Sequence, residues 1–194
     1  MKSVGPVLVC LAILTLVVST RAQVNVPVIP AASIDTTMKD FNAALGVECT
    51  FCHVKDDWKS AGEPKWAVAR NMWRMVQALN ADQLTKTRGI RCATCHGGQN
   101  KPSRLPPESW QAIADRWPAT AAEDQKLTMS VYSASLGVGC EHCHDPADWK
   151  SKGKPAFATA LRMVAMFSEF PKYMPATART QCFMCHKGQK QPQA

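Results

Sequence analysis

The chain has 194 residues and a formal net charge of +8, and 46% of its residues are hydrophobic. This length is enough for one domain of medium size or for two small ones. The lysines and arginines are scattered along the chain instead of forming a stripe, so the positive charge does not indicate a nucleic-acid-binding protein.

Residues 1–22 have the pattern of an export signal. Lys2 supplies the positive start, residues 7–18 form an apolar run, and residues 20–22 provide a cleavage site. The run is shorter than the ~20 apolar residues of a membrane span. The pattern therefore predicts a signal peptide that is cleaved, together with Cys10, and a mature chain that works in the periplasm.

A first unit is predicted over residues 23–100. It begins with a short helix that carries Met38 and stops at Gly46, because glycine suits the position just after a helix. A Cys-x-x-Cys-His motif follows at once, at residues 49–53.

The same unit contains a second helix and a second motif. Pro64 is expected to open the helix, where the missing N–H of proline costs little. The helix runs through Met72 and Met75 toward Asn80, and a polar stretch then leads to Cys-x-x-Cys-His at residues 92–96.

Residues 101–118 are predicted to link this unit to the next. The proline-rich stretch "QNKPSRLPP" at residues 99–107 reads as a connection, and "ESWQAIADRW" after it predicts a short bridging helix.

A second unit, residues 119–194, repeats the first with a shift of 91 residues. The aligned pairs are Met38 and Met129, Gly46 and Gly137, Cys49 and Cys140, Pro64 and Pro155, Met72 and Met163, and Met75 and Met166. In the second unit, Pro171 is expected to break the second helix. No segment alternates with a period of two, so the predicted fold is mainly α with little or no sheet.

Cysteine usage is the most informative feature. Apart from Cys10, the cysteines form four pairs, each followed by a histidine: Cys49, Cys52 and His53; Cys92, Cys95 and His96; Cys140, Cys143 and His144; Cys182, Cys185 and His186. A disulfide framework or two Cys₄ zinc sites would also use eight cysteines, but neither needs the histidines. Cys-x-x-Cys-His is the signature of covalent c-type haem attachment, with the histidine on one face of the iron. The chain is therefore predicted to be a multihaem cytochrome c with two tandem dihaem units.

The second axial position of each iron needs a ligand, and a methionine thioether is suitable. Met38 and Met129 stand at the same distance from their cysteines in both units, which favours ligation over ordinary core packing. On the second helices the candidates are Met72 or Met75, and Met163 or Met166. Met174 and Met184 have no repeat partner, so they are expected to pack.

Several other residues are expected near the haems. Trp58 and Trp149 recur in both units and are expected to cover haem edges. Lys59 and Lys150 are candidates to pair with propionates, or are solvated lysines. His142 is expected at the surface or against a propionate.

The order of methionine helix and haem motif, repeated twice in each half, resembles the tetrahaem cytochrome subunit of photosynthetic reaction centres. "ARNMWRMVQALN" at residues 69–80 looks like the second ligand helix of that family, and "CATCHGGQ" and "CFMCHKGQ" look like its motif with trailing glycine. The resemblance spans about residues 33–190 and implies Met72 and Met163 as ligands. Family subunits are much longer. They can also use a histidine between the second methionine and the second motif, and residues 81–91 contain none. Four haems with His/Met ligation are therefore expected.

The resemblance implies electron transfer to a photosynthetic reaction centre, with that complex or a soluble cytochrome as partner and only indirect membrane association. A periplasmic respiratory carrier is the alternative. A multihaem reductase would need an iron with an open position, and a filament of stacked haem subunits is a further possibility.

Overall fold

The structure is a computed structural model that describes residues 29–60, 64–82, 89–175, 177–178 and 180–192. The predicted signal peptide lies outside these residues. The described α-helices are α1 (Ile34–Leu45), α2 (Pro64–Ala81), α3 (Cys92–His96), α4 (Pro107–Ala114), α5 (Glu123–Leu136), α6 (Pro155–Phe167) and α7 (Phe183–His186). Short 3₁₀ turns are η1 (Ala31–Ser33), η2 (Cys49–Phe51), η3 (Cys140–His142) and η4 (Phe170–Lys172). Two isolated bridges are the only β pairing in the described ranges, so the prediction of a mainly α fold is confirmed.

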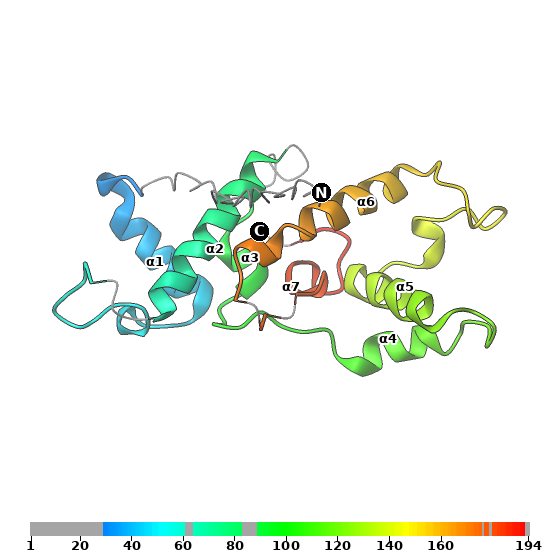
Figure 1. The fold of residues 1–194 in the computed structure, drawn as a ribbon, viewed down its shortest axis with the longest axis horizontal. Helices are drawn as coiled ribbons and strands as arrows, with labels where there is room; N and C mark the ends of the chain where they lie inside the picture. The colour runs from blue at the N-terminus through cyan, green and yellow to red at the C-terminus, as the bar shows by residue number, and fades with distance from the viewer. Residues whose placement is uncertain (1–28, 61–63, 83–88, 176, 179, 193–194) are drawn as a thin grey trace, which may run out of the picture.

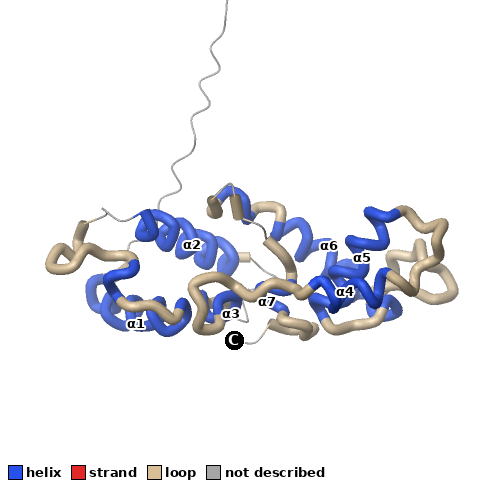
Figure 2. Tube along the Cα trace, turned by 90° about the horizontal axis from the view of Figure 1, so that it is seen from below, coloured by secondary structure: helices blue, strands red, loops and turns tan. Residues whose placement is uncertain are grey.

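The molecule is elongated, and the helices of the two halves occupy its two ends (Figure 1). Helices α1 and α2 form one end, and α4, α5 and α6 form the other. The two short helices α3 and α7 pack against each other in the middle, as both ribbon and tube views show (Figure 2). The second motif of each half is thus placed at the boundary between the halves.

The first helix of each half ends at a glycine for two reasons. Gly46 and Gly137 both adopt the left-handed conformation, with φ of 62° and 61°, which glycine enters without steric cost. A Cβ on Gly46 would also collide with the carbonyl oxygen of Gly98, and one on Gly137 with that of Gly188. The trailing glycines of the second and fourth motifs are therefore where each motif docks on its first helix.

Backbone hydrogen bonds hold this docking. The Gly98 N–H donates to the Ala44 carbonyl at 2.8 Å, and the Gly188 N–H donates to the Ser135 carbonyl at 3.0 Å. Each bond uses a carbonyl from the last turn of its helix, where no intrahelical partner exists.

The second helices begin where proline predicted, at Pro64 and Pro155. Helix α6 ends at Phe167, before Pro171, which lies in the separate turn η4. Helix α2 runs to Ala81, and the Asn80 side chain then bonds both backbone groups of Ile90, at 2.7 and 2.8 Å. This pair of bonds fixes the approach of the chain to α3.

The core formed by side chains is small. Its central cluster contains Met75 and Leu79 of α2 and Phe170 of η4, each no more than 7% exposed. Partly buried side chains packed around it are Met72, Ile90, Met166, Phe167, Tyr173 and Met174. The cluster joins the first half of the chain to the second.

Candidate functional site

All four Cys-x-x-Cys-His motifs fold into a single helical turn. In the first and third motifs, the backbone N–H of the histidine donates to the backbone carbonyl of the first cysteine, at 3.1 Å for His53 and 3.0 Å for His144. The second and fourth motifs form α3 and the turn that includes α7. Residues three and four apart lie on one face of a helix, so each turn presents two sulfurs and an imidazole to the same side, as attachment and ligation of one haem require.

Three motif histidines have Nδ1 within hydrogen-bond distance of a backbone carbonyl oxygen. His96 Nδ1 lies 2.9 Å from the Gln99 carbonyl oxygen, and His144 Nδ1 lies 3.1 Å from that of Trp149. His186 Nδ1 lies 3.1 Å from the Gln189 carbonyl oxygen. A carbonyl oxygen only accepts hydrogen bonds, so Nδ1 carries the hydrogen in each ring, and Nε2 is then the nitrogen that a metal would use. Such outer partners also orient a metal-binding imidazole.

His53 is different. Its Nδ1 is buried without a hydrogen-bond partner, although the Trp58 ring lies near it, with 6.2 Å between ring centroids. Trp58 follows His53 by the same spacing that separates Trp149 from His144. The two equivalent turns therefore hold their histidines differently.

Sequence reasoning missed the carbonyls that orient these histidines. Gln99 and Gln189 each stand three residues after their histidine in "CHGGQ" and "CHKGQ". The repeated spacing of glutamine after histidine could have indicated these two contacts. The contact of Trp149 uses its backbone carbonyl, which every residue has, so the sequence could not have indicated it. The Trp149 side chain itself is 55% exposed, and that of Trp58 is 51% exposed.

Burial keeps several of these groups neutral. It raises the pKa of the Cys52, Cys92, Cys143 and Cys182 thiols above the ordinary cysteine value. Burial also lowers the pKa of His96, against the opposing effect of the Gln99 carbonyl. Neutral imidazole is the form that binds a metal.

The predicted axial methionines are all half-buried, and they lie in different surroundings. Met75 is fully in the core cluster, and Met72 and Met166 pack against it, whereas Met163 is not part of it. Met38 and Met129 lie on α1 and α5, which dock on the second and fourth motifs.

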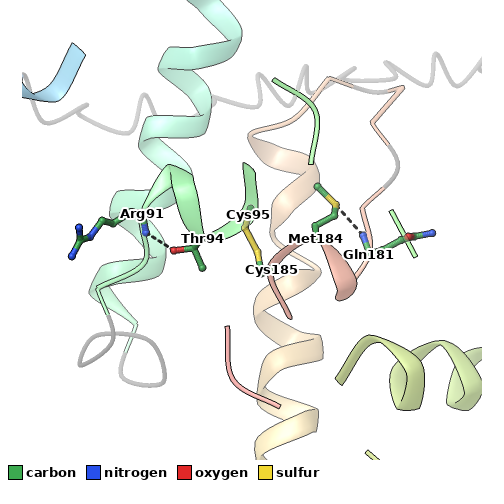
Figure 3. The surroundings of a disulfide bond; sticks show 6 residues. All are labelled: Arg91, Thr94, Cys95, Gln181, Met184 and Cys185. Carbon is green, nitrogen blue, oxygen red and sulfur yellow. Dashed lines mark hydrogen bonds between the residues drawn. A yellow bond between two sulfur atoms is a disulfide. The ribbon is translucent and has the colours of Figure 1, made fainter. Parts of the chain in front are cut away.

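Two further methionines were expected to pack. Met174 lies against the core cluster. The Met184 sulfur accepts a hydrogen bond from the Gln181 N–H at 3.3 Å (Figure 3).

An apolar cavity of about 130 Å³ lies beside the fourth motif. Its walls come from α5, α6 and the segment that leads into α7, and its lining residues are Val131, Tyr132, Val164, Phe167, Thr180, Gln181 and Cys182. An apolar space bounded by the first cysteine of a motif suits part of a haem ring.

One feature of the structure opposes haem attachment at two motifs. Cys95 and Cys185, the second cysteines of the second and fourth motifs, form a disulfide (Figure 3). The other described cysteines are free thiols: Cys49, Cys52, Cys92, Cys140, Cys143 and Cys182. A sulfur in a disulfide has no S–H to add to a haem vinyl group. At the first and third motifs, both cysteines are free thiols and the residues fit a haem. At the second and fourth motifs, the residues fit a haem when the disulfide is reduced.

The remaining predicted residues lie at the surface. Lys59 and Lys150 are exposed, and His142 is half-buried in η3. Within the described ranges, no group of three or more His, Cys, Asp or Glu side chains is arranged to hold a metal ion. Among the same residues, no helix has the length and apolar character needed to cross a membrane.

Comparison with known proteins connects this geometry to a family. Residues 32–138, more than half of the chain, match the family model "Photosynthetic reaction centre cytochrome C subunit". A cytochrome c-554 of Chloroflexus aurantiacus is 38% identical over 42% of this chain and 22% of its own length. A photosynthetic reaction center cytochrome c subunit of Thermochromatium tepidum is 24% identical over 74% of this chain and 52% of its own length. The subunit of Rubrivivax gelatinosus is 37% identical over 34% and 22%.

The chain spans about half or less of the length of each of these relatives. A cytochrome c family implies covalently bound haem c, in agreement with the four motif turns. The matched residues include α1 to α5, with the first two motifs and the histidine carbonyl partner Gln99. The chain belongs to the family of photosynthetic reaction centre cytochrome c subunits.

Proposed function

We propose that this chain is an exported electron carrier with four covalently attached c-type haems, and that it donates electrons to a photosynthetic reaction centre. The observation that carries the proposal is the combination of family membership with four motif turns, three of which hold the histidine ring through Nδ1 against a backbone carbonyl. Haem iron supplies reversible one-electron transfer, which is not an activity of the side chains themselves.

Each motif would hold one haem through its two cysteines and its histidine. The thioether-forming residues are Cys49, Cys52, Cys92, Cys95, Cys140, Cys143, Cys182 and Cys185. The histidine ligands are His53, His96, His144 and His186. The Gln99, Trp149 and Gln189 carbonyls would fix the rings of His96, His144 and His186 through Nδ1.

The second axial ligands would be Met38, Met72, Met129 and Met163. The position of Met75 in the core cluster supports a packing role for it and leaves the partly buried Met72 as the ligand of its pair. The alignment of the two halves then gives Met163, the counterpart of Met72, as the ligand on α6. Methionine ligation generally raises the potential of a haem, which suits donation to a strong oxidant.

The placement of the motifs supports an order of electron transfer. The second and fourth motifs meet where α3 packs on α7, whereas the first and third lie toward opposite ends of the molecule (Figure 1). Electrons would then pass from the first haem to the second, from the second to the fourth, and from the fourth to the third, or in reverse.

The methionine assignment is tested by a matched pair of variants. Met38→Ala should lower the potential of one haem and open one iron to carbon monoxide. Met75→Ala, in the buried core, should destabilise the fold and leave every iron closed. An iron opened by Met75→Ala would contradict the assignment on α2.

The electron acceptor is tested by flash excitation of membranes that contain the protein, with the c-haem absorbance followed in time. Fast oxidation that is lost in a deletion strain would identify the protein as a donor to the reaction centre. Haem oxidation that requires a chemical or respiratory oxidant, without any response to light, would contradict that role and leave the haem-bearing chain intact.

A further inference from the structure

Lys187 directly follows the histidine of the fourth motif, and its side chain reaches across to the second motif. The Lys187 Nζ atom lies 2.6 Å from the point that a Cβ on Gly97 would occupy, and Gly97 directly follows His96. We propose that this ammonium group is a fixed positive charge that raises the reduction potential of the haem on the second motif. The inference rests on the proposed function, because it requires a haem at His96. It adds a residue of one motif that acts on the haem of another.

The packing of α3 on α7 explains how a lysine of the fourth motif reaches the second. Cys95 and Cys185 meet at this contact, and Gly97 and Lys187 each stand two residues after their cysteine (Figure 3). Gly97 has no side chain, so it leaves the space into which the Lys187 side chain extends. A side chain at position 97 would collide with the ammonium group.

Backbone contacts that involve no cysteine hold both turns in these positions. The Gly98 N–H donates to the Ala44 carbonyl, and the Gly188 N–H donates to the Ser135 carbonyl. These bonds belong to the residues that directly follow Gly97 and Lys187. They keep the two turns docked on α1 and α5 when all the motif cysteines are attached to haem.

The backbone at position 187 gives no reason for a lysine. Lys187 has φ of 50°, a left-handed conformation that is strained for a residue with a side chain, and the equivalent Gly97 has φ of 56°. Glycine enters this conformation without steric cost, so a glycine would suit both halves. Strain that a protein retains at one position is typical of a functional role for the side chain.

The Lys187 charge is half-buried and is not neutralised by a neighbour. Among the residues that the structure describes, both ion pairs lie elsewhere, between Lys126 and Glu123 and between Lys172 and Glu169. The charge acts on the imidazole of the second motif: burial lowers the pKa of His96, the Gln99 carbonyl opposes this effect, and the Lys187 ammonium group lowers the pKa further.

The direction of the effect on a haem follows from charge. An oxidised haem carries one more positive charge than a reduced one, so a nearby cation is repelled more strongly by the oxidised form. The ammonium group therefore favours the reduced second haem. Lys187 neither gains nor loses an electron in this role, because the electron comes from the neighbouring redox partner and resides on the haem.

The charge is tested by potentiometric titration of the purified, haem-loaded protein. In Lys187→Gln, the ratio of reduced to oxidised second haem at a fixed potential should fall about tenfold, which corresponds to 59 mV for a one-electron couple. Lys187→Arg keeps the charge and should change this ratio less than about twofold. Unchanged potentials in Lys187→Gln, or an equal fall in Lys187→Arg, would overturn the proposal.

The matched control is Lys190→Gln, which removes the same charge three residues further along the chain. Lys190 is exposed, and water and salt screen an exposed charge strongly. We expect a change of less than about twofold at every haem. A tenfold change in this control would show that net charge alone sets the potential, and would overturn the role of Lys187.

A glycine variant separates the charge from the backbone strain. Lys187→Gly removes both, whereas Lys187→Gln removes the charge and keeps a side chain in the strained conformation. We expect the same fall in potential in the two variants. A fall in Lys187→Gln alone would attribute the effect to the strained backbone and overturn the proposal.

The affected haem is identified by removing it. Cys92→Ser combined with Cys95→Ser leaves no thiol to attach the second haem, and in that background Lys187→Gln should no longer cause a tenfold change. A tenfold change that persists would place the effect at another haem and overturn the proposal. Intact mass counts the haems: four haems in the unmodified protein with no response to Lys187→Gln would overturn this inference alone, whereas a missing second haem in the unmodified protein would overturn the proposed function as well.

Discussion

Helix α2 of the first half buries Met75, Val76 and Leu79, whereas its counterpart α6 in the second half buries none of its side chains. Leu161 and Val164 of α6 are instead 54% and 40% exposed. Among the described residues of the second half, Phe170 alone belongs to the central cluster. Matching sequence motifs therefore do not imply matching burial, and the first half provides most of the side-chain core that both halves share.

The two halves agree closely where backbone meets backbone. In both, the first helix ends in a left-handed glycine that lies against the glycine after the second motif of its half. They differ at the residue that follows α3 in the first half and α7 in the second. This residue is Gly97 in the first half and Lys187, a non-glycine residue with φ of 50°, in the second. Close backbone contacts are thus shared by both halves, and side-chain contacts distinguish them.

The largest expected effect tests the shared feature. Gly46→Ala or Gly137→Ala adds a strained left-handed alanine, at about 1–2 kcal/mol, and forces a backbone carbonyl to move, at about 1–3 kcal/mol more. Gly89→Ala is the matched control, because Gly89 also has φ of 62° but nothing lies within 4 Å of the added Cβ. We expect denaturant unfolding, followed by circular dichroism, to show a clearly larger loss for the first two variants. Equal losses at all three glycines would mean that close approach contributes nothing.

The second prediction tests the difference in burial between the halves. Leu79→Ala in α2 should lower the free energy of unfolding by about 2–3 kcal/mol, because it leaves a cavity in the central cluster. Leu161→Ala in α6 should change it by no more than about 0.5 kcal/mol, as at other exposed positions. The same unfolding measurement compares them. A large loss at Leu161 would indicate that α6 is covered by something other than solvent.

The smallest expected effect concerns the histidines of the first and third motifs. The carbonyl bonded to His144 Nδ1 increases the basicity of that imidazole, whereas His53 Nδ1 has no such partner. Under the proposed function, the first haem should therefore have a reduction potential tens of millivolts above that of the third. Potentiometric titration can assign the two, because Met38→Ala and Met129→Ala should each shift one of them. A higher potential at the third haem would show that another influence outweighs the hydrogen bond.

The sequence by itself determined the local features of this protein. Gly46 and Gly137 predicted the ends of the first helices, Pro64 and Pro155 predicted the starts of the second, and the Cys-x-x-Cys-His motifs predicted the places where haem is attached. These features depend on backbone preferences and spacings within a few residues, so each can be read without knowledge of the rest of the chain.

Only the tertiary structure decided what these elements meet. The contact of α3 with α7, the pairing of Cys95 with Cys185 and the packing of Phe170 on Met75 join residues about 90 or more positions apart. No spacing rule specifies such pairs, because they result from how the two docked halves fit together. The same holds for His53 and His144, which occupy the same place in their Cys-x-x-Cys-His motifs, because the folded backbone gives a hydrogen-bond partner to His144 Nδ1 and none to His53 Nδ1.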